Sequence, residues 1–103
     1  MNRPEHLLAC LAEECDEVGK NCMKALRFGL ADGYPGSSVT NAQEIAKELS
    51  DLIAVMRMLV AEGLIPKPDL GGSAITAKQT KVEKYLAYAR EVGALVAPAC
   101  EAE

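Results

Sequence analysis

Two short acidic clusters contain the side chains best suited to chemistry in this chain. Glu13 and Glu14 are followed three residues later by Glu17, and a second pair, Glu48 and Asp51, lies further along. Both clusters interrupt stretches that otherwise have the pattern of apolar helices. An ionised carboxylate in an apolar interior is strongly destabilising unless it is paired, bound to a metal or protonated. The nature of the neutralising partner therefore decides the function.

Three helices are predicted to position these acids. The first is expected over Pro4–Phe28, because proline suits a first helical turn and Gly29 suits the exit. The second is expected from Asn41, which with Glu44 resembles a capping box. The predicted helices span 4–28, 41–62 and 74–92, separated by Gly/Pro-rich loops at 32–38 and 67–73. The fold class is therefore all-α: a small bundle of three main helices.

The position of each acid on its helix gives it a direction. At about 100° per residue, Glu14 falls in the middle of the apolar face of the first helix and Glu17 at its edge. Glu13 lies next to that face, whereas Asp16 points to solvent. The apolar faces consist of Leu7, Leu11, Val18 and Ala25 in the first helix and Ile45, Leu49, Leu52, Met56 and Leu59 in the second. Glu17 follows Glu14 by three residues, so their side chains are neighbours on the helix surface. At this spacing two carboxylates can share a cation.

The second helix offers a matching pair. Glu48 and Asp51 lie on the flank of its apolar face, again three residues apart. Carboxylate oxygens without a neighbouring imidazole favour Mg²⁺ or Mn²⁺ as the bound cation. The only histidine, His6, lacks a Glu-x-x-His spacing and is expected at the surface. Because Mg²⁺ in proteins commonly binds together with substrate phosphates, the acids point to phosphate chemistry.

The third predicted helix contains positive charge that could complement such a substrate. Lys78, Lys81, Tyr85 and Tyr88 form one stripe along it. Lysines can neutralise phosphate oxygens, and a tyrosine can stack on a base or donate its hydroxyl. Lysines beside an apolar face also commonly extend to water without any ligand. Lys78, Lys81 and Tyr85 are therefore candidates for substrate binding.

Composition limits the class of protein. The chain has 103 residues, half of them hydrophobic and a quarter charged, with a net charge of -4. These values predict one small helical domain over 1–103, with a core at about 4–93 and a loose tail at 98–103. The acidic balance argues against nucleic-acid binding, which needs a basic surface. No apolar run reaches the roughly 20 residues that span a bilayer, and the N-terminus lacks a signal-peptide pattern. A cytoplasmic location is expected.

The four cysteines do not form a recognisable metal or disulfide motif. Cys10, Cys15, Cys22 and Cys100 include no C-x-x-C pair. Cys15 and Cys22 are one heptad apart on one predicted helix, which is too far for a disulfide. They are interpreted as free cysteines that pack as small core residues.

The two acidic motifs, in this order, resemble the signature of a known family. Glu13-Glu14-x-x-Glu17 followed by Glu48-x-x-Asp51 looks like the E-E-x-x-E and E-x-x-D motifs of the MazG-like all-α nucleoside triphosphate pyrophosphohydrolases. The flanking segments 7–12, 24–29 and 52–55 are similar too, and the resemblance extends over about residues 5–90. The interval between the two motifs is long for the family, which leaves base recognition open.

The resemblance implies hydrolysis of a (deoxy)nucleoside triphosphate between its α and β phosphates, giving a nucleoside monophosphate and pyrophosphate. It implies that Glu14, Glu17, Glu48 and Asp51 bind Mg²⁺ and that Glu13 helps to orient or deprotonate the attacking water. It also implies a homodimer or homotetramer and a role in nucleotide-pool housekeeping. Two alternatives stay open: a non-catalytic helical oligomerisation module, and a metal-dependent protein that binds nucleotides without fast turnover.

Overall fold

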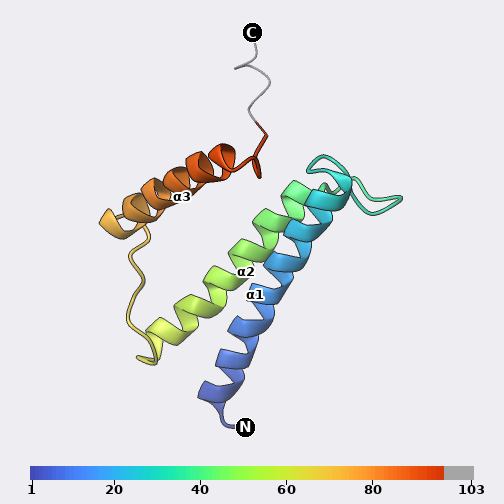
Figure 1. Ribbon diagram of the computed structural model, residues 1–103. Coiled ribbons are helices and arrows are strands. Elements are labelled where there is room, and N and C mark those ends of the chain that lie inside the picture. Colours follow the sequence, from blue (N-terminus) through green and yellow to red (C-terminus); the bar gives the residue numbers. More distant parts are fainter. Residues whose placement is uncertain (97–103) are drawn as a thin grey trace. The chain divides into compact units, whose positions relative to one another are not determined.

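The computed structural model describes residues 1–96, which form three α-helices (Figure 1). They are α1 (Arg3–Phe28), α2 (Asn41–Ala61) and α3 (Ser73–Glu91), and residues 1–96 contain no strand. The all-α class with three main helices is confirmed, and the helix ends differ from the predicted ones by at most one residue. The predicted loose tail at 98–103 lies outside the described residues.

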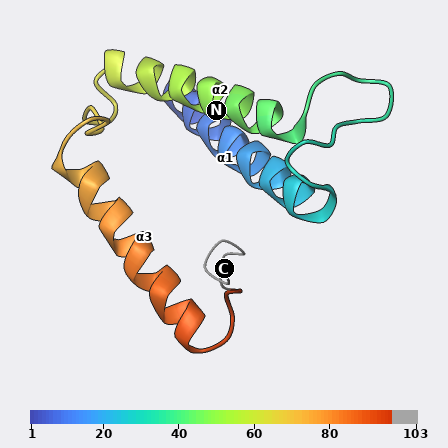
Figure 2. The ribbon, with the colours of Figure 1, turned by 90° about the horizontal axis from the view of Figure 1, so that it is seen from above.

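The chain divides into two compact units, one over Met1–Lys67 and one from Pro68 onward. In the first unit α1 and α2 lie side by side and run in opposite directions, as both ribbon views show (Figures 1 and 2). In the second unit α3 is the one regular element among the described residues. The acidic motifs therefore belong to one helical hairpin.

Both helices of this hairpin begin with a side-chain cap. The Asn2 Oδ1 atom accepts a hydrogen bond from the Glu5 backbone N–H at 2.9 Å. At α2, Thr40 Oγ1 accepts from the Gln43 N–H at 3.1 Å, and Gln43 Oε1 accepts from the Thr40 N–H at 2.9 Å. The capping box predicted at Asn41 is thus wrong by one residue. Asn41 is buried, and its side chain instead donates to the carbonyl oxygen of Gly29 at 2.8 Å.

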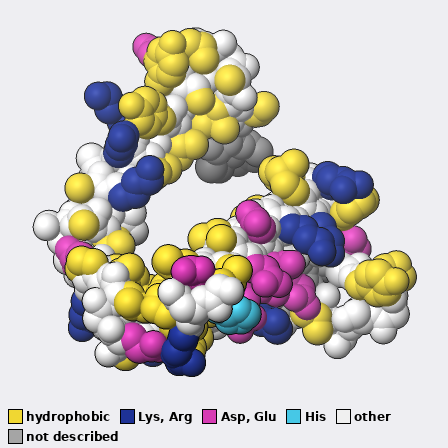
Figure 3. Space-filling model, turned by 90° about the horizontal axis from the view of Figure 1, so that it is seen from below, with side chains coloured by type: hydrophobic (Ala, Val, Ile, Leu, Met, Phe, Trp, Pro, Cys, Tyr) yellow, Lys and Arg dark blue, Asp and Glu magenta, His cyan; other side chains and the backbone are white. Residues whose placement is uncertain are grey.

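The core of the hairpin is narrow. Leu7 from α1 and Met56 and Leu59 from α2 are its buried apolar residues. Other apolar residues of the predicted faces are half-buried, namely Leu11, Val18, Ala25, Ile45 and Leu52. Large apolar side chains such as Leu26 remain exposed, and apolar surface is visible between the charged side chains in Figure 3.

One residue departs from the predicted apolar face of α2. Leu49 is exposed, whereas Glu48 and Asp51 are half-buried. The face of α2 that packs on α1 is therefore centred closer to Glu48 than the apolar residues alone indicate. At about 100° per residue, this rotation moves Leu49 outward and the two acids inward. The prediction that Leu49 packs in the core is wrong for this reason.

The connection between α1 and α2 is held by hydrogen bonds. The backbone N–H groups of Asn41 and Ala42 donate to the carbonyl oxygens of Asp32 and Leu30, at 2.6 and 3.0 Å. Within the loop, the Ser37 N–H donates to the Tyr34 carbonyl at 2.9 Å. The intervening residues are proline and then Gly36 with φ of 86°, the pattern of a type II turn.

Within residues 1–96, none of the three helices has both the length and the apolar composition needed to cross a bilayer. This finding agrees with the absence of a long apolar run in the sequence.

Candidate metal centre

The hairpin brings together three of the four acids predicted to bind a metal. Glu14 of α1 and Glu48 and Asp51 of α2 each offer a carboxylate oxygen, and these three atoms lie within 4.8 Å of one another. All three residues are half-buried. They converge because Glu14 occupies the middle of the inward face of α1, and the face of α2 that meets it is centred close to Glu48. We call these residues the carboxylate triad.

Glu14 is the least compensated member of the triad. Its Oε2 atom is buried and has no hydrogen-bond partner among the described residues. Burial is the main factor that raises the pKa of Glu14, and the neighbouring Glu48, Asp51 and Glu13 raise it further. A carboxylate in such a place is stabilised either by taking up a proton or by binding a cation. A cation bound at the triad would therefore neutralise a carboxylate that has no positively charged partner within residues 1–96.

A lysine partly neutralises the other two acids. Lys47 Nζ lies 3.1 Å from Asp51 Oδ2 and 3.5 Å from Glu48 Oε1. The hydrogen bond to Asp51 and the charges of both acids raise the pKa of Lys47. The Lys47 side chain is 62% exposed, so water screens these ion pairs and they are weak. No ion pair to Glu14 occurs within residues 1–96.

The triad has the donor chemistry of a hard divalent cation site. All of its candidate ligand atoms are carboxylate oxygens, which suit Mg²⁺ and Mn²⁺ better than zinc. The buried and unpartnered oxygen of Glu14 is a position where a cation would replace a missing hydrogen bond. The residues present therefore fit the cation that the motifs predict, with Glu14, Glu48 and Asp51 as the residues that would hold it.

The remaining acids of the first motif lie around the triad. Glu17 is half-buried but is not one of the three clustered carboxylates, and it lines an adjoining pocket together with Glu48. Glu13 is exposed, and its charge contributes to the raised pKa of Glu14. Asp16 is exposed, as the helical wheel predicted. The structure thus leaves Glu17 and Glu13 beside the carboxylate triad.

The predicted substrate-binding residues of α3 belong to the second unit. Lys78, Lys81 and Tyr85 are exposed side chains of this helix. Lys81 Nζ lies 6.0 Å from the centroid of the Tyr85 ring, a cation–π distance. Their contact with a substrate stays a prediction.

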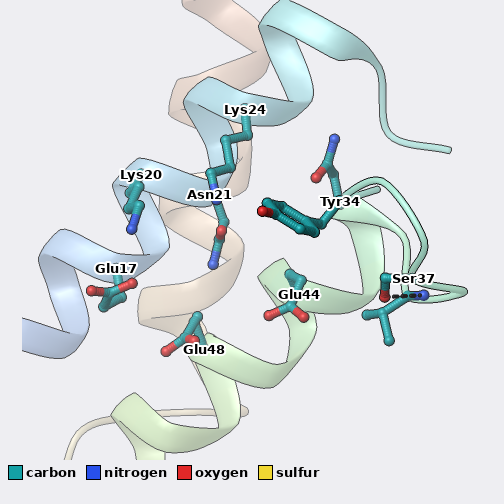
Figure 4. A pocket seen from close by; sticks show the side chains of 10 residues that line it. Glu17, Lys20, Asn21, Lys24, Tyr34, Ser37, Glu44 and Glu48 are labelled. Atoms are coloured by element: carbon teal, nitrogen blue, oxygen red, sulfur yellow. Dashed lines mark hydrogen bonds between the residues drawn. The ribbon is translucent and has the colours of Figure 1, made fainter. Parts of the chain in front are cut away.

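A polar pocket of about 250 Å³ adjoins the triad and shares Glu48 with it (Figure 4). It lies between α1, the start of α2 and the loop that joins them. The lining side chains include Glu17, Lys20, Asn21, Lys24, Tyr34 and Glu48. Sequence reasoning missed Lys20, Asn21, Lys24 and Tyr34 as site residues. Asn21 did leave a signal, because it follows Glu14 by one heptad and so continues the inward polar face.

Among the described residues, neither the histidine nor a cysteine belongs to the cluster of candidate metal ligands. His6 is exposed, as predicted. Cys10 is half-buried, but Cys15 and Cys22 are exposed free thiols, so the prediction that they pack in the core is wrong. Cys100 lies outside the described residues.

Comparisons of the chain with models of known protein families, with curated proteins and with solved structures gave no match. Its function is inferred from its own side chains, above all from the carboxylate triad and the pocket beside it.

Proposed function

We propose that this protein is a Mg²⁺-dependent nucleoside triphosphate pyrophosphohydrolase of the MazG-like type, acting in nucleotide-pool housekeeping. It would cleave a (deoxy)nucleoside triphosphate between the α and β phosphates, releasing a nucleoside monophosphate and pyrophosphate. The observation that carries the proposal is the convergence of Glu14, Glu48 and Asp51 from two helices, with one buried carboxylate oxygen unpartnered. Mn²⁺ would support the same chemistry.

The residues of the hairpin have distinct proposed roles. The triad would hold the metal ion, and Glu17 stands one helical turn away at the edge of the pocket. A divalent ion bound there would lower the pKa of a coordinated water and offset charge on the phosphoryl oxygens. Glu13, exposed beside the triad, would orient the attacking water and accept its proton. Positioning and charge neutralisation are the dominant contributions in phosphoryl transfer.

A substrate panel tests this function directly. The full chain is incubated with each common NTP and dNTP in Mg²⁺, in Mn²⁺ and in EDTA, and pyrophosphate release is measured. We expect release with the divalent ions and none in EDTA. Glu48→Gln and Asp51→Asn should each lower kcat/KM by about a hundredfold or more, because each removes a charged metal ligand. Asp16→Asn is the matched control, since Asp16 is an exposed acid of α1 outside the triad.

Two results would contradict the proposal. One is the absence of turnover on every nucleotide, together with a melting temperature that Mg²⁺ and a non-hydrolysable triphosphate leave unchanged. The other is full activity in the triad variants. Binding that stabilises the fold without any turnover would instead indicate a metal-dependent nucleotide-binding protein.

One observation favours a second candidate, a non-catalytic helical interaction module. Lys47 already pairs with Glu48 and Asp51, and apolar side chains such as Leu26 are exposed on the same hairpin. In such a module the acids would serve as structural ion-pair partners. Asp51→Asn would then lower the melting temperature equally with and without Mg²⁺, whereas a metal ligand would show its larger effect in Mg²⁺.

A further inference from the structure

Asn21 is a largely buried residue whose side-chain amide has no protein partner among the described residues. It is only 7% exposed, and its side chain makes no hydrogen bond within residues 1–96. Figure 4 shows it pointing from α1 toward Glu48, into the polar pocket. Its amide atoms are open to the pocket, because Glu14 Oε2 is the one fully enclosed side-chain polar atom without a partner among the described residues. A group that enters this pocket can therefore supply both an acceptor and a donor for Asn21.

Tyr34 forms the opposite wall of the same pocket. It points from the loop toward Asn21 and Lys24 (Figure 4), yet its side chain is 80% exposed. The hydrogen bond between its carbonyl and the Ser37 N–H fixes its backbone in the turn. A β-carbon at Gly33 would collide with the Val39 carbonyl, so this glycine allows the close approach that shapes the loop. An exposed aromatic ring on an ordered turn is a suitable stacking surface for a planar ring.

The charges of the pocket favour an uncharged polar ligand group over a second phosphate. Glu17, Lys20 and Lys24 line it from α1, whereas Glu44 and Glu48 line it from α2. Three carboxylates would repel a phosphate that is not held by a metal ion. A nucleobase or a sugar carries no net charge, and it can form hydrogen bonds with the lysine side chains as well as with the carboxylates.

The pocket and the triad adjoin and share Glu48. Asn21 follows Glu14 by two turns of α1, about 10 Å along the helix axis. Along α2, which runs the other way, Glu48 and Glu44 lead from the triad toward the same pocket. From this arrangement we infer that the pocket binds the nucleoside part of the substrate, with Asn21 hydrogen-bonding the edge of the base and Tyr34 stacking on its face. This inference rests on the proposed function, because that function places the phosphates at the triad.

Binding of nucleosides without phosphate isolates this pocket from the metal centre. The full chain in EDTA is titrated with thymidine, deoxycytidine, deoxyadenosine and deoxyguanosine, and the side-chain amide signals of Asn21 are followed by NMR. At least one nucleoside should shift these signals in a saturable way. Asn21→Leu should weaken that binding by about tenfold and Tyr34→Ala by about five- to a hundredfold, the usual range for a lost hydrogen bond and a lost stacking ring.

Matched variants separate binding from folding. Tyr34→Phe keeps the ring and should retain most of the affinity, and Tyr88→Ala removes an exposed tyrosine of α3 and should change nothing. Circular dichroism and melting temperature verify that each variant is folded. Inorganic pyrophosphate, titrated with Mg²⁺ present, should bind Asn21→Leu as tightly as it binds the parent.

The outcomes distinguish this inference from the proposed function. Nucleoside binding that depends on Asn21 and Tyr34, in a protein that hydrolyses no triphosphate, would support the pocket and overturn the hydrolase. Hydrolysis with an unchanged ratio of kcat/KM among the bases in folded Asn21→Leu and Tyr34→Ala would overturn the pocket alone. An equal loss of pyrophosphate and nucleoside affinity in Asn21→Leu would also overturn it, because the residue would then serve phosphate. Absence of nucleoside binding to the parent would overturn it as well.

Discussion

At the scale of single residues, Glu14 decides how the hairpin responds to protons and metal ions. Its raised pKa means that the folded protein holds the Glu14 proton more tightly than the unfolded chain does. The resulting contribution to stability is complete below the ordinary pKa of about 4.5, and it is lost as the pH rises through the raised pKa of the folded state. At neutral pH without metal, the Glu14 carboxyl group therefore makes the fold less stable than it does at low pH.

Replacement of this carboxylate by an amide removes that penalty. In EDTA at pH 7, we expect Glu14→Gln to melt at a higher temperature than the parent, and the difference should shrink toward pH 4. A divalent ion at a hundred times its Kd should stabilise the parent by about 2.7 kcal/mol and the variant by less. Thermal melts over pH 4–8 with and without Mg²⁺ measure both effects. A variant less stable than the parent under every condition would instead indicate that Glu14 has a structural ion-pair role.

Lys47 competes with a metal ion for the same acids. Its pairs with Glu48 and Asp51 must weaken when a divalent cation binds between them. An exposed ion pair contributes about 0.2–1 kcal/mol, so Lys47→Ala should raise the affinity for Mg²⁺ by up to about fivefold. Calorimetric titration measures this, with Arg57→Ala as the control for loss of an exposed charge on α2. Equal affinities in the parent and both variants would show that Lys47 does not compete.

At the scale of the helices, the sequence contained most of the information that the structure confirms. The spacing of the apolar residues and the Gly/Pro-rich segments were sufficient to predict where all three helices begin and end. The angular position of Glu14 on its helix was sufficient to predict that it points inward. The exposure of Leu49 did not follow, because the rotation of α2 depends on its packing against α1. The pocket was missed for a related reason: Tyr34 reaches Asn21 only through the shape of a loop, which no periodicity specifies.

The capping box at the start of α2 offers a test of how far this helix supports the site. Thr40→Ala removes the hydrogen bond from the Gln43 N–H and should lower the free energy of unfolding by about 1 kcal/mol. Urea denaturation measures the loss. Ser38→Ala is the control, since Ser38 is an exposed loop residue whose side chain makes no hydrogen bond within residues 1–96. An equal effect of both substitutions would mean that the cap is not formed.

At the scale of the whole molecule, the narrow core makes association between copies the expected state. Leu7, Met56 and Leu59 are the buried apolar residues of the described chain, and large side chains such as Leu26 are exposed. Small domains with little buried apolar surface commonly depend on oligomerisation for stability.

Sedimentation at several protein concentrations tests this expectation. A dimer or tetramer should form, and the melting temperature should rise with protein concentration, because dissociation accompanies unfolding. Leu26→Glu places a charge on the exposed apolar surface and should shift the distribution toward smaller species if that surface is buried between copies. A monomer with a concentration-independent melting temperature would contradict the prediction.

The location of the triad within one hairpin also bears on the order of events during synthesis. Glu14, Glu48 and Asp51 all lie in the unit that ends at Lys67. Chains emerge from the ribosome N-terminus first, at about 5–20 residues per second. The three carboxylates can therefore be brought together as soon as the hairpin up to Lys67 has emerged and folded, before α3 is complete.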